Sequence, residues 1–270
     1  MSDRPDLAPY RVRHNLKFRM LQVLRVQTLT PHLIRVTFTG DDLDDFESAS
    51  FDDHIKVFFP APGTDQLSLP TMGPDGLIFP GGERPVMRDF TPRRFDRAAR
   101  EFDIEFAVHE AGPAASWALQ ARPGQTLGIG GPRGSLVIPA GFDWHLLIGD
   151  ETALPAIARR LEELPAAARV IAIIEVADPS ARMAFVTNTE LHAVWCYRSE
   201  SGARGAAMLE AIRETDLPQG EGYVWAAGES ASMRAVRQHL VAERGIDKKR
   251  IRAAAYWRQG DAGVHENLDD

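Results

Sequence analysis

The hydrophobic pattern of this chain changes near residue 142, and that change constrains the fold more than any other feature of the sequence. Before it, short runs alternate apolar and polar residues between Pro and Gly, which is typical of half-buried antiparallel strands. These runs cover residues 15–29, 32–40, 54–60, 86–91, 101–109 and 135–139, and one short helix is expected at 112–121. Many short strands joined by turns predict a small antiparallel β-barrel over residues 1–141.

After residue 142, apolar strands alternate with helical segments. The expected strands are 144–150, 169–176, 193–198, 222–228 and 251–257, and the expected helices are 152–164, 204–214 and 229–244. This alternation predicts an α/β domain over residues 142–270, with a parallel sheet that helices cover on both faces. Ligands bind such sheets at the carboxyl ends of their strands, so we expect residues 149–153 and 227–230 to line a binding crevice.

Composition excludes several classes of protein. A length of 270 residues accommodates two domains. The only cysteine, Cys196, cannot form an internal disulfide or hold an iron–sulfur cluster, which takes several cysteine ligands. A net charge of −7 argues against a nucleic-acid-binding protein. Neither a bilayer-spanning apolar run nor the apolar part of a secretory signal is visible, so we expect a cytoplasmic protein that does not bind membranes.

Common catalytic and nucleotide-binding motifs are also missing. The sequence has no HExxH zinc motif, no GxxxxGK[ST] phosphate loop and no GxSxG nucleophile motif. Residues 128–134 (GIGGPRG) nearly fit the dinucleotide motif GxGxxG, but a strand-like segment follows them instead of a helix. We therefore interpret residues 128–134 as a turn of the barrel.

Residues 88–93 (RDFTPR) combine two arginines, an aromatic ring and a hydroxyl in an extended segment. An aromatic side chain can stack on a planar ring, and the fork of an arginine binds phosphate. Strand alternation would place Arg88 and Phe90 on one face and Asp89, Thr91 and Arg93 on the other. From composition alone, the segment could equally be an edge strand with solvated charges.

Three other segments carry residues suited to binding. Residues 109–117 (HEAGPAASW) open a helix with small residues directly after a strand, which suits an anion but also fits a simple connector. Residues 149–153 (GDETA) and 227–229 (AGE) stand at strand-to-helix junctions, where Asp150 or Thr152 could also be an ordinary helix cap. Residues 256–260 (YWRQG) follow the last strand and could be only a surface aromatic pair.

Taken together and in this order, RDFTPR, HEAGPAASWA, GGPRGS, GDETALPAI, AGES and AYWRQG resemble the siderophore-interacting proteins. This family comprises ferric-siderophore reductases among the ferredoxin-reductase-like flavoproteins, and the resemblance runs from about residue 17 to 260. It implies an N-terminal FAD-binding barrel and a C-terminal domain that binds NADPH or NADH. The family usually has Tyr where this chain has Phe90, so one hydrogen bond to the flavin would be lost here.

The resemblance also implies which residues bind the cofactors. Those expected at FAD are Arg88, Asp89, Phe90, Thr91, Arg93, His109, Gly112, Ala114, Ala115, Ser116 and Trp117. Those expected at the nicotinamide nucleotide are Asp150, Glu151, Thr152, Ala227, Gly228 and Glu229. No side-chain acid, base or nucleophile is required, because bound FAD would carry the electrons. The sequence does not choose between NADH and NADPH, since Arg182, Arg198 and Arg204 could each reach a 2′-phosphate.

The family resemblance further implies a substrate pocket with three basic residues, Lys56, Arg133 and Arg258, for an anionic ferric siderophore. Alternation around Lys56 does not settle which way its side chain faces. The expected protein is a monomeric reductase that moves electrons from NAD(P)H through FAD to Fe(III), with no catalytic side chain and no resident metal. Two alternatives stay open: a flavin reductase with another acceptor, and a non-enzymatic module that binds siderophore or flavin.

Overall fold

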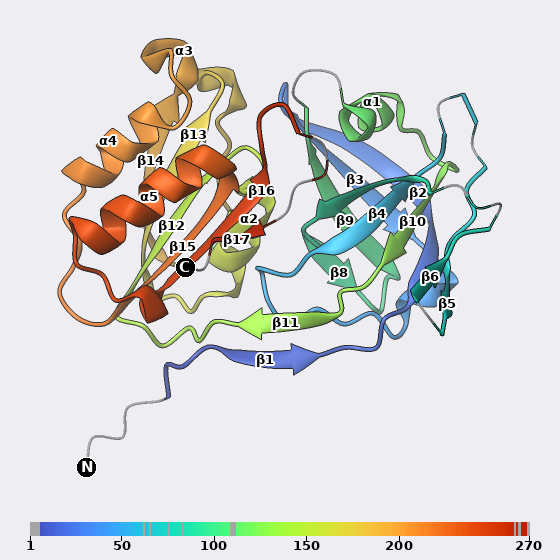
Figure 1. Cartoon of the computed structure of the whole chain (residues 1–270), viewed down its shortest axis with the longest axis horizontal. Helices are drawn as coiled ribbons and strands as arrows, with labels where there is room; N and C mark the ends of the chain where they lie inside the picture. The colour runs from blue at the N-terminus through green and yellow to red at the C-terminus, as the bar shows by residue number, and fades with distance from the viewer. Residues whose placement is uncertain are drawn as a thin grey trace. The chain divides into compact units, whose positions relative to one another are not determined.

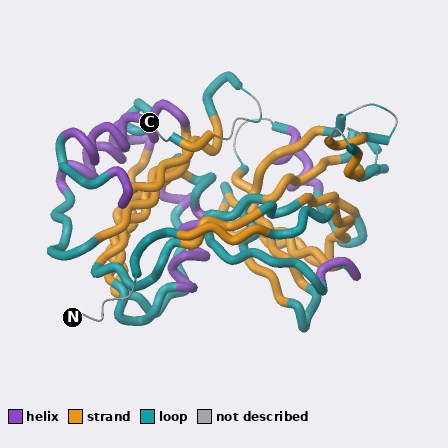
Figure 2. Tube along the Cα trace, turned by 60° about the horizontal axis from the view of Figure 1, so that its bottom comes forward, coloured by secondary structure: helices purple, strands orange, loops and turns teal. Residues whose placement is uncertain are grey.

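The computed structural model describes residues 6–61, 63–64, 66–74, 76–80, 82, 84–108, 112–261, 263 and 266–268. The chain divides into two compact units, and each is described by itself. The N-terminal unit is Pro9–Val137, and the C-terminal unit is Ile138–Asp270 together with Met1–Ala8. Most of the helix lies in the C-terminal unit, whereas the N-terminal unit is mainly strand and loop (Figure 2).

The N-terminal unit is built around one antiparallel sheet with the strand order β7-β4-β10-β2-β3-β9-β8. Two small ladders, β1 with β11 and β5 with β6, accompany it. Its strands are β1 (Tyr10–Arg13), β2 (Phe18–Thr30), β3 (Leu33–Thr39), β4 (Ile55–Phe59), β5 (Thr71–Gly73), β6 (Gly76–Ile78), β7 (Val86–Phe90), β8 (Arg94–Asp96), β9 (Glu101–Ala107), β10 (Thr126–Gly130) and β11 (Gly134–Val137); its helices are η1 (Asp41–Leu43) and α1 (Pro113–Gln120).

The large sheet is curled, and a short connection explains why. Its two edge strands, β7 and β8, are joined by residues 91–93 alone. A connection of this length spans at most about 14 Å. The two edge strands of a seven-stranded sheet can lie that close to each other only if the sheet bends round on itself. Among the described strands no ladder joins β7 to β8, so the expected closed barrel is a curled sheet. Its inner face buries an apolar cluster that includes Leu21, Val36 and Phe102.

The interpretation of residues 128–134 as a turn is wrong for most of the segment. Gly128 and Gly130 lie in β10, a central strand, and only residues 131–133 connect it to β11. These glycines are needed because other side chains pack directly on the strand. A Cβ atom would lie 2.2 Å from Leu69 Cδ2 at Gly128 and 2.8 Å from the Phe18 ring at Gly130. The run of glycines therefore indicated close packing on a strand.

The C-terminal unit contains a six-stranded sheet with the order β14-β13-β12-β15-β16-β17. Its strands are β12 (Trp144–Asp150), β13 (Arg169–Val176), β14 (Glu190–Tyr197), β15 (Gly222–Glu229), β16 (Ile251–Trp257) and β17 (Glu266–Asn267). Its helices are α2 (Leu154–Glu163), η2 (Pro179–Ala181), α3 (Arg198–Ser201), α4 (Ala206–Glu214), α5 (Ser230–Ala242) and η3 (Lys248–Arg250). The first five strands in that order pair in parallel, but β17 pairs antiparallel to β16, so the expected parallel sheet is mixed.

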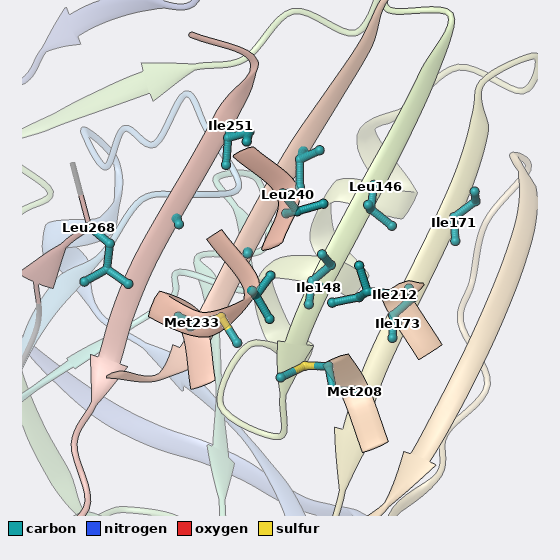
Figure 3. Packing of buried hydrophobic residues seen from close by; sticks show 14 of the residues in the cluster. Leu146, Ile148, Ile171, Ile173, Met208, Ile212, Met233, Leu240, Ile251 and Leu268 are labelled. Carbon is teal, nitrogen blue, oxygen red and sulfur yellow. The ribbon is translucent and has the colours of Figure 1, made fainter. Parts of the chain in front are cut away.

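Helices cover both faces of this sheet, as the alternation of strands and helices predicts. Figure 1 shows α4 and α5 on one face and α2 on the other. Met208 and Ile212 of α4 and Met233 and Leu240 of α5 pack on strand residues such as Ile148 (Figure 3). Each such side chain removed from water stabilises the fold by about 1.5–3 kcal/mol. No described helix is both long and apolar enough to cross a membrane.

Two buried basic side chains hold the first residues of the C-terminal unit. His145 Nε2 donates to the carbonyl of Ala140 at 3.3 Å, and Arg160 Nη2 donates to the carbonyl of Pro139 at 2.9 Å. Burial, with a smaller contribution from the charge of Arg160, lowers the pKa of His145 from 6.5 to about 4. Native His145 is therefore neutral at pH values where the unfolded chain would carry a proton there.

This pKa shift makes stability depend on pH in a defined window. As the pH falls from 6.5 to about 4, the unfolded chain gains a proton that the native state does not accept, so stability is lost across that range. His145→Gln keeps a hydrogen-bond donor but cannot titrate, and we expect its stability to fall less between pH 7 and pH 4.5. Urea midpoints at the two pH values measure this difference. His192→Gln, at an exposed histidine, serves as the control, and equal losses in wild type and His145→Gln would contradict the assignment.

Candidate functional site

Lys56 and Asp89 form an ion pair across neighbouring strands of the N-terminal unit. They are direct partners in the β4–β7 ladder, and Lys56 Nζ lies 2.7 Å from Asp89 Oδ1 and 2.8 Å from Oδ2. Ile55 and Val57 point into the core, so Lys56 faces outward, with half of its side chain exposed. The structure therefore settles the direction that the sequence left open, and it adds a carboxylate that holds the ammonium group in place.

Residues 88–90 follow the predicted alternation, since Arg88 and Phe90 pair with the inward-facing Val57 and Ile55 while Asp89 pairs with Lys56. The alternation stops there, because β7 ends at Phe90. The Phe90 ring packs on Phe106 with centroids 4.7 Å apart, at the edge of the core. Thr91 and Arg93 are buried instead of lying on a strand face. Arg88 is half-buried, and its Nη1 donates to the neighbouring Met87 carbonyl at 2.7 Å.

A buried carboxylate balances two arginines behind this segment. Glu105 is fully buried, and its Oε1 lies 3.3 Å from Arg93 Nε and also accepts from Arg35. Two guanidinium groups thus contact one carboxylate, and guanidinium groups are also well suited to bind phosphate. Glu105 and Arg35 were not among the residues predicted from the sequence, since their only signal was a charged residue inside an apolar strand run.

Helix α1 contributes the second part of this site. Its N-cap is Gly112. Among the residues that the structure describes, which leave out 109–111, no side chain caps its first turn and nothing would lie within 4 Å of a Cβ at Gly112. The free N–H groups of an uncapped first turn favour an anion. Trp117 turns the other way and stacks on Phe38 in the core, with centroids 6.2 Å apart. Ala114, Ala115 and Ser116 lie in the first turn, and the predicted site residue His109 lies outside the described residues.

In the C-terminal unit, Asp150 joins the ends of three strands. It closes β12, and its Oδ1 accepts from Thr152 N at 2.9 Å and from Thr152 Oγ1 at 2.5 Å. Its Oδ2 accepts from Glu229 N at the end of β15, at 3.0 Å, and from Trp257 Nε1 at the end of β16, at 2.9 Å. Three predicted residues, Asp150, Thr152 and Glu229, are thus brought together with Trp257, for which the sequence predicted no such role.

Asp150 holds these strand ends together from inside the fold. Its side chain is only 2% exposed, and this burial raises the pKa of its carboxyl. The hydrogen bonds from Thr152 and Trp257 oppose the shift but do not cancel it. A Cβ at Gly228 would lie 2.8 Å from Asp150 Oδ2, and φ there is +154°, so glycine is required. Neither Asp150 nor Thr152 is the N-cap of α2, which is Ala153. The acidic cap is instead Glu229, whose side chain accepts from Ser232 N of α5 at 2.9 Å.

A second set of charged residues lies at or after the ends of β12, β13 and β14. Glu151 forms a bidentate ion pair with Arg198, in which Nη1 of the arginine lies 3.0 Å from Oε2 of the glutamate. The same Nη1 atom lies 3.7 Å from Glu175 Oε1. Glu175 is buried at the end of β13 and accepts from Gly205 N at 2.8 and 3.0 Å; burial raises its pKa. The guanidinium of Arg204 lies 4.8 Å from the centroid of the Trp257 ring. Glu175 was not among the residues predicted from the sequence.

The three residues expected at the substrate are all exposed. Lys56 lies on β4, Arg133 lies in the connection between β10 and β11, and Arg258 follows β16 in the other unit. Arg258 contacts Asp261 at 3.4 Å and Glu266 at 3.3 Å. Among the residues that the structure describes, no group of three or more His, Cys, Asp or Glu side chains is arranged to hold a metal ion.

Comparison with known proteins covers both units. A family model described as "Siderophore-interacting FAD-binding domain" matches residues 22–136, and one described as "Siderophore-interacting protein" matches residues 142–260. The chain is 36% identical to the NADPH-dependent ferric-chelate reductase of Escherichia coli, over 92% of this chain and 96% of that protein. It is also 36% identical to the ferric vibriobactin reductase ViuB of Vibrio cholerae, over 92% of this chain and 93% of that protein.

Solved structures confirm the fold. The crystal structure of a siderophore utilization protein from T. fusca is 37% identical and superposes with a TM-score of 0.87, covering 95% of this chain and 98% of that one. A ferredoxin reductase of carbazole 1,9a-dioxygenase, only 16% identical, superposes with a TM-score of 0.65 over 87% of this chain and 68% of that one. The architecture is therefore the two-domain ferredoxin-reductase-like fold, with a curled antiparallel sheet followed by a mixed α/β sheet.

The four hydrogen bonds to Asp150 generate a stability prediction. Each carboxylate oxygen of Asp150 accepts two hydrogen bonds. In Asp150→Asn one of these oxygens becomes an NH₂ group, which can only donate, so at least one buried donor loses its partner. We expect a loss of about 1–3 kcal/mol in the free energy of unfolding, measured by urea denaturation. The matched control Asp216→Asn, at an exposed aspartate with the same chemical change, should stay within about 0.5 kcal/mol of wild type. Equal effects at both positions would contradict the role given to Asp150.

Proposed function

Because this chain belongs to the siderophore-interacting protein family, we propose that it moves electrons from NAD(P)H through FAD to Fe(III) held in a siderophore and thereby releases Fe(II). The observation that carries this proposal is the identity of 36% with the Escherichia coli NADPH-dependent ferric-chelate reductase over almost the whole of both chains. In this proposal the curled sheet (residues 1–141) works as the FAD-binding barrel. The α/β domain (residues 142–270) binds the nicotinamide nucleotide.

The N-terminal unit fits FAD in the chemistry of its donors. Arg93 and Arg35 both contact the carboxylate of Glu105, and guanidinium groups of this kind also bind phosphate. The uncapped first turn of α1 behind Gly112 supplies N–H donors for a second anionic group. The partly buried ring of Phe90 offers an apolar surface against which a flat ring system can lie.

Each unit would then contribute a separate part of the reaction. Bound FAD would supply the exchange between a two-electron donor and a one-electron acceptor. In the C-terminal unit, Asp150 holds the ends of β12, β15 and β16 in register, so that the backbone of residues 149–153 and 227–229 can approach a nucleotide. No side chain needs to act as an acid, a base or a nucleophile.

The substrate would be attracted by exposed cations. Ferric siderophores are often anionic, and Lys56, Arg133 and Arg258 are the positive groups that we assign to them. Asp89 fixes the ammonium group of Lys56 and offsets part of its charge. Oxygen chelators hold Fe(II) more weakly than Fe(III), so one-electron reduction releases the metal. A monomeric state, a cytoplasmic location and the absence of nucleic-acid binding stay predictions from the sequence.

The proposed activity predicts that Fe(II) forms from a ferric siderophore under anaerobic conditions. FAD-loaded protein is mixed anaerobically with NADPH or NADH, a ferric siderophore and a chromogenic Fe(II) chelator. We expect the ferrous complex to form faster than in a flavin-free control. Bleaching of the flavin without a ferrous complex would indicate another electron acceptor. A protein that binds flavin or siderophore but is not bleached by either nucleotide would be a binding module.

The basic residues predict a loss of substrate binding that spares the flavin. Single substitutions Lys56→Gln, Arg133→Gln and Arg258→Gln each remove one charge, and we expect the KM for an anionic ferric siderophore to rise by about tenfold. Steady-state kinetics and the flavin absorbance per protein measure the two effects. Arg11→Gln, at an exposed arginine of β1, is the matched control. Loss of FAD, with KM unchanged in the loaded fraction, would refute this assignment.

A further inference from the structure

Three arginines near the carboxyl ends of β13 and β14 are candidates for binding a nucleotide phosphate: Arg182, Arg198 and Arg204. NADPH differs from NADH only by a 2′-phosphate, and a nearby arginine commonly accommodates that group. The contacts of each arginine show which of them is available to a ligand. The inference drawn from them rests on the proposed function and concerns the nucleotide that the enzyme uses.

Arg198 is already neutralised by its neighbours. It makes a bidentate pair with Glu151 and lies 3.7 Å from Glu175, and its side chain is only 18% exposed. Both oxygens of Glu151 already accept hydrogen bonds from the guanidinium of Arg198, so a phosphate could bind there only by displacing Glu151. Arg198 therefore orders the crevice and offers little charge to a ligand.

Glu175 is also unavailable, which matters for NADH. In dinucleotide-binding folds, an acidic residue near the end of the second strand accepts hydrogen bonds from the ribose hydroxyls of NADH. Glu175 occupies such a place at the end of β13, but it is 1% exposed and both of its oxygens accept from Gly205 N. The group that would favour NADH is thus turned inward and used by the protein.

Arg204 and Arg182 are both exposed to solvent, and they differ in where they lie. The guanidinium of Arg204 lies over the Trp257 ring, and Trp257 is itself fixed by its bond to Asp150. Among the described residues no carboxylate lies within ion-pair distance of Arg204, although its charge contributes weakly to the pKa of Glu175. Stacking on an aromatic ring orders a guanidinium while leaving its N–H donors free.

The position of Arg204 suits a nucleotide better than that of Arg182. Trp257 and Asp150 mark the ends of β16 and β12, beside β15, and ligands bind where the strand order reverses between β12 and β15. Arg182 lies 6.0 Å from the ring of Trp195, which belongs to the edge strand β14. The strand β13 separates that edge from β12.

We propose that Arg204, ordered on the ring of Trp257, binds the 2′-phosphate of NADPH and makes this chain prefer NADPH to NADH. The inward-facing Glu175 contributes to the same preference, because its own carboxylate is not available to bind the hydroxyls of an unphosphorylated ribose. The Asp150–Trp257 bond then acts through Arg204, since it fixes the ring on which the guanidinium lies.

The test uses two nicotinamide-free probes that differ by one phosphate, 2′-phospho-ADP-ribose and ADP-ribose. Each is titrated calorimetrically into the FAD-loaded full-length protein. We expect Arg204→Ala to weaken binding of 2′-phospho-ADP-ribose by about tenfold or more and to leave ADP-ribose within about twofold. Arg204→Lys, which keeps the charge but loses the fork, should fall between. Arg213→Ala, at an exposed arginine near the other end of α4, is the matched control.

Several results would overturn the proposal. One is unchanged binding of both probes in Arg204→Ala. Another is an equal loss for both, which would assign Arg204 to the pyrophosphate, and a third is a selective loss in Arg182→Ala instead. The rate at which NADPH and NADH bleach the flavin under anaerobic conditions is a second readout, and it needs no iron. A selective loss in Arg204→Ala would therefore stand even if ferric reduction failed, so the two proposals fail separately.

Discussion

The buried carboxylate of Asp150 is the interaction on which the candidate nucleotide site depends. Two oxygens accept four hydrogen bonds from Thr152, Glu229 and Trp257, and these residues stand at the ends of three different strands. Burying a carboxylate is costly unless such donors are supplied, so the strand ends are held in one arrangement. The position of the Asp150 carboxylate leaves no room for a Cβ atom at residue 228, which is therefore glycine. The hydrogen bond to Trp257 also fixes the ring over which the guanidinium of Arg204 lies.

Both units use buried carboxylates in the same way. Glu105 in the N-terminal unit orients Arg35 and Arg93, and Glu175 in the C-terminal unit holds Gly205 N and approaches Arg198. In each case the acid lies inside the fold and holds a cationic group in place. Under the proposed function, exposed cations such as Arg204 would let a chain with a net charge of −7 bind anions. The surplus of negative charge does not determine the local field at these sites.

The sequence predicted the architecture well where a pattern extends over many residues. Alternation of strands and helices after residue 142 correctly indicated an α/β sheet, but the two-residue strand β17 is too short to have a pattern, and it made the sheet mixed. Gly128 and Gly130 were mistaken for a turn because their requirement comes from Leu69 and Phe18, which are distant in sequence. The direction of Lys56 likewise depends on which face of β4 meets the core, and Ile55 and Val57 take that face only once the sheet has formed.

The central claim is that electrons pass from a nicotinamide nucleotide through a flavin bound to this chain and on to chelated iron. The most direct measurement follows the flavin absorption band of the purified protein in the absence of oxygen. NADPH is added first, and a ferric siderophore is added afterwards. Our account predicts that the band bleaches with NADPH and returns when the ferric siderophore is added. A band that stays bleached after the second addition would contradict it.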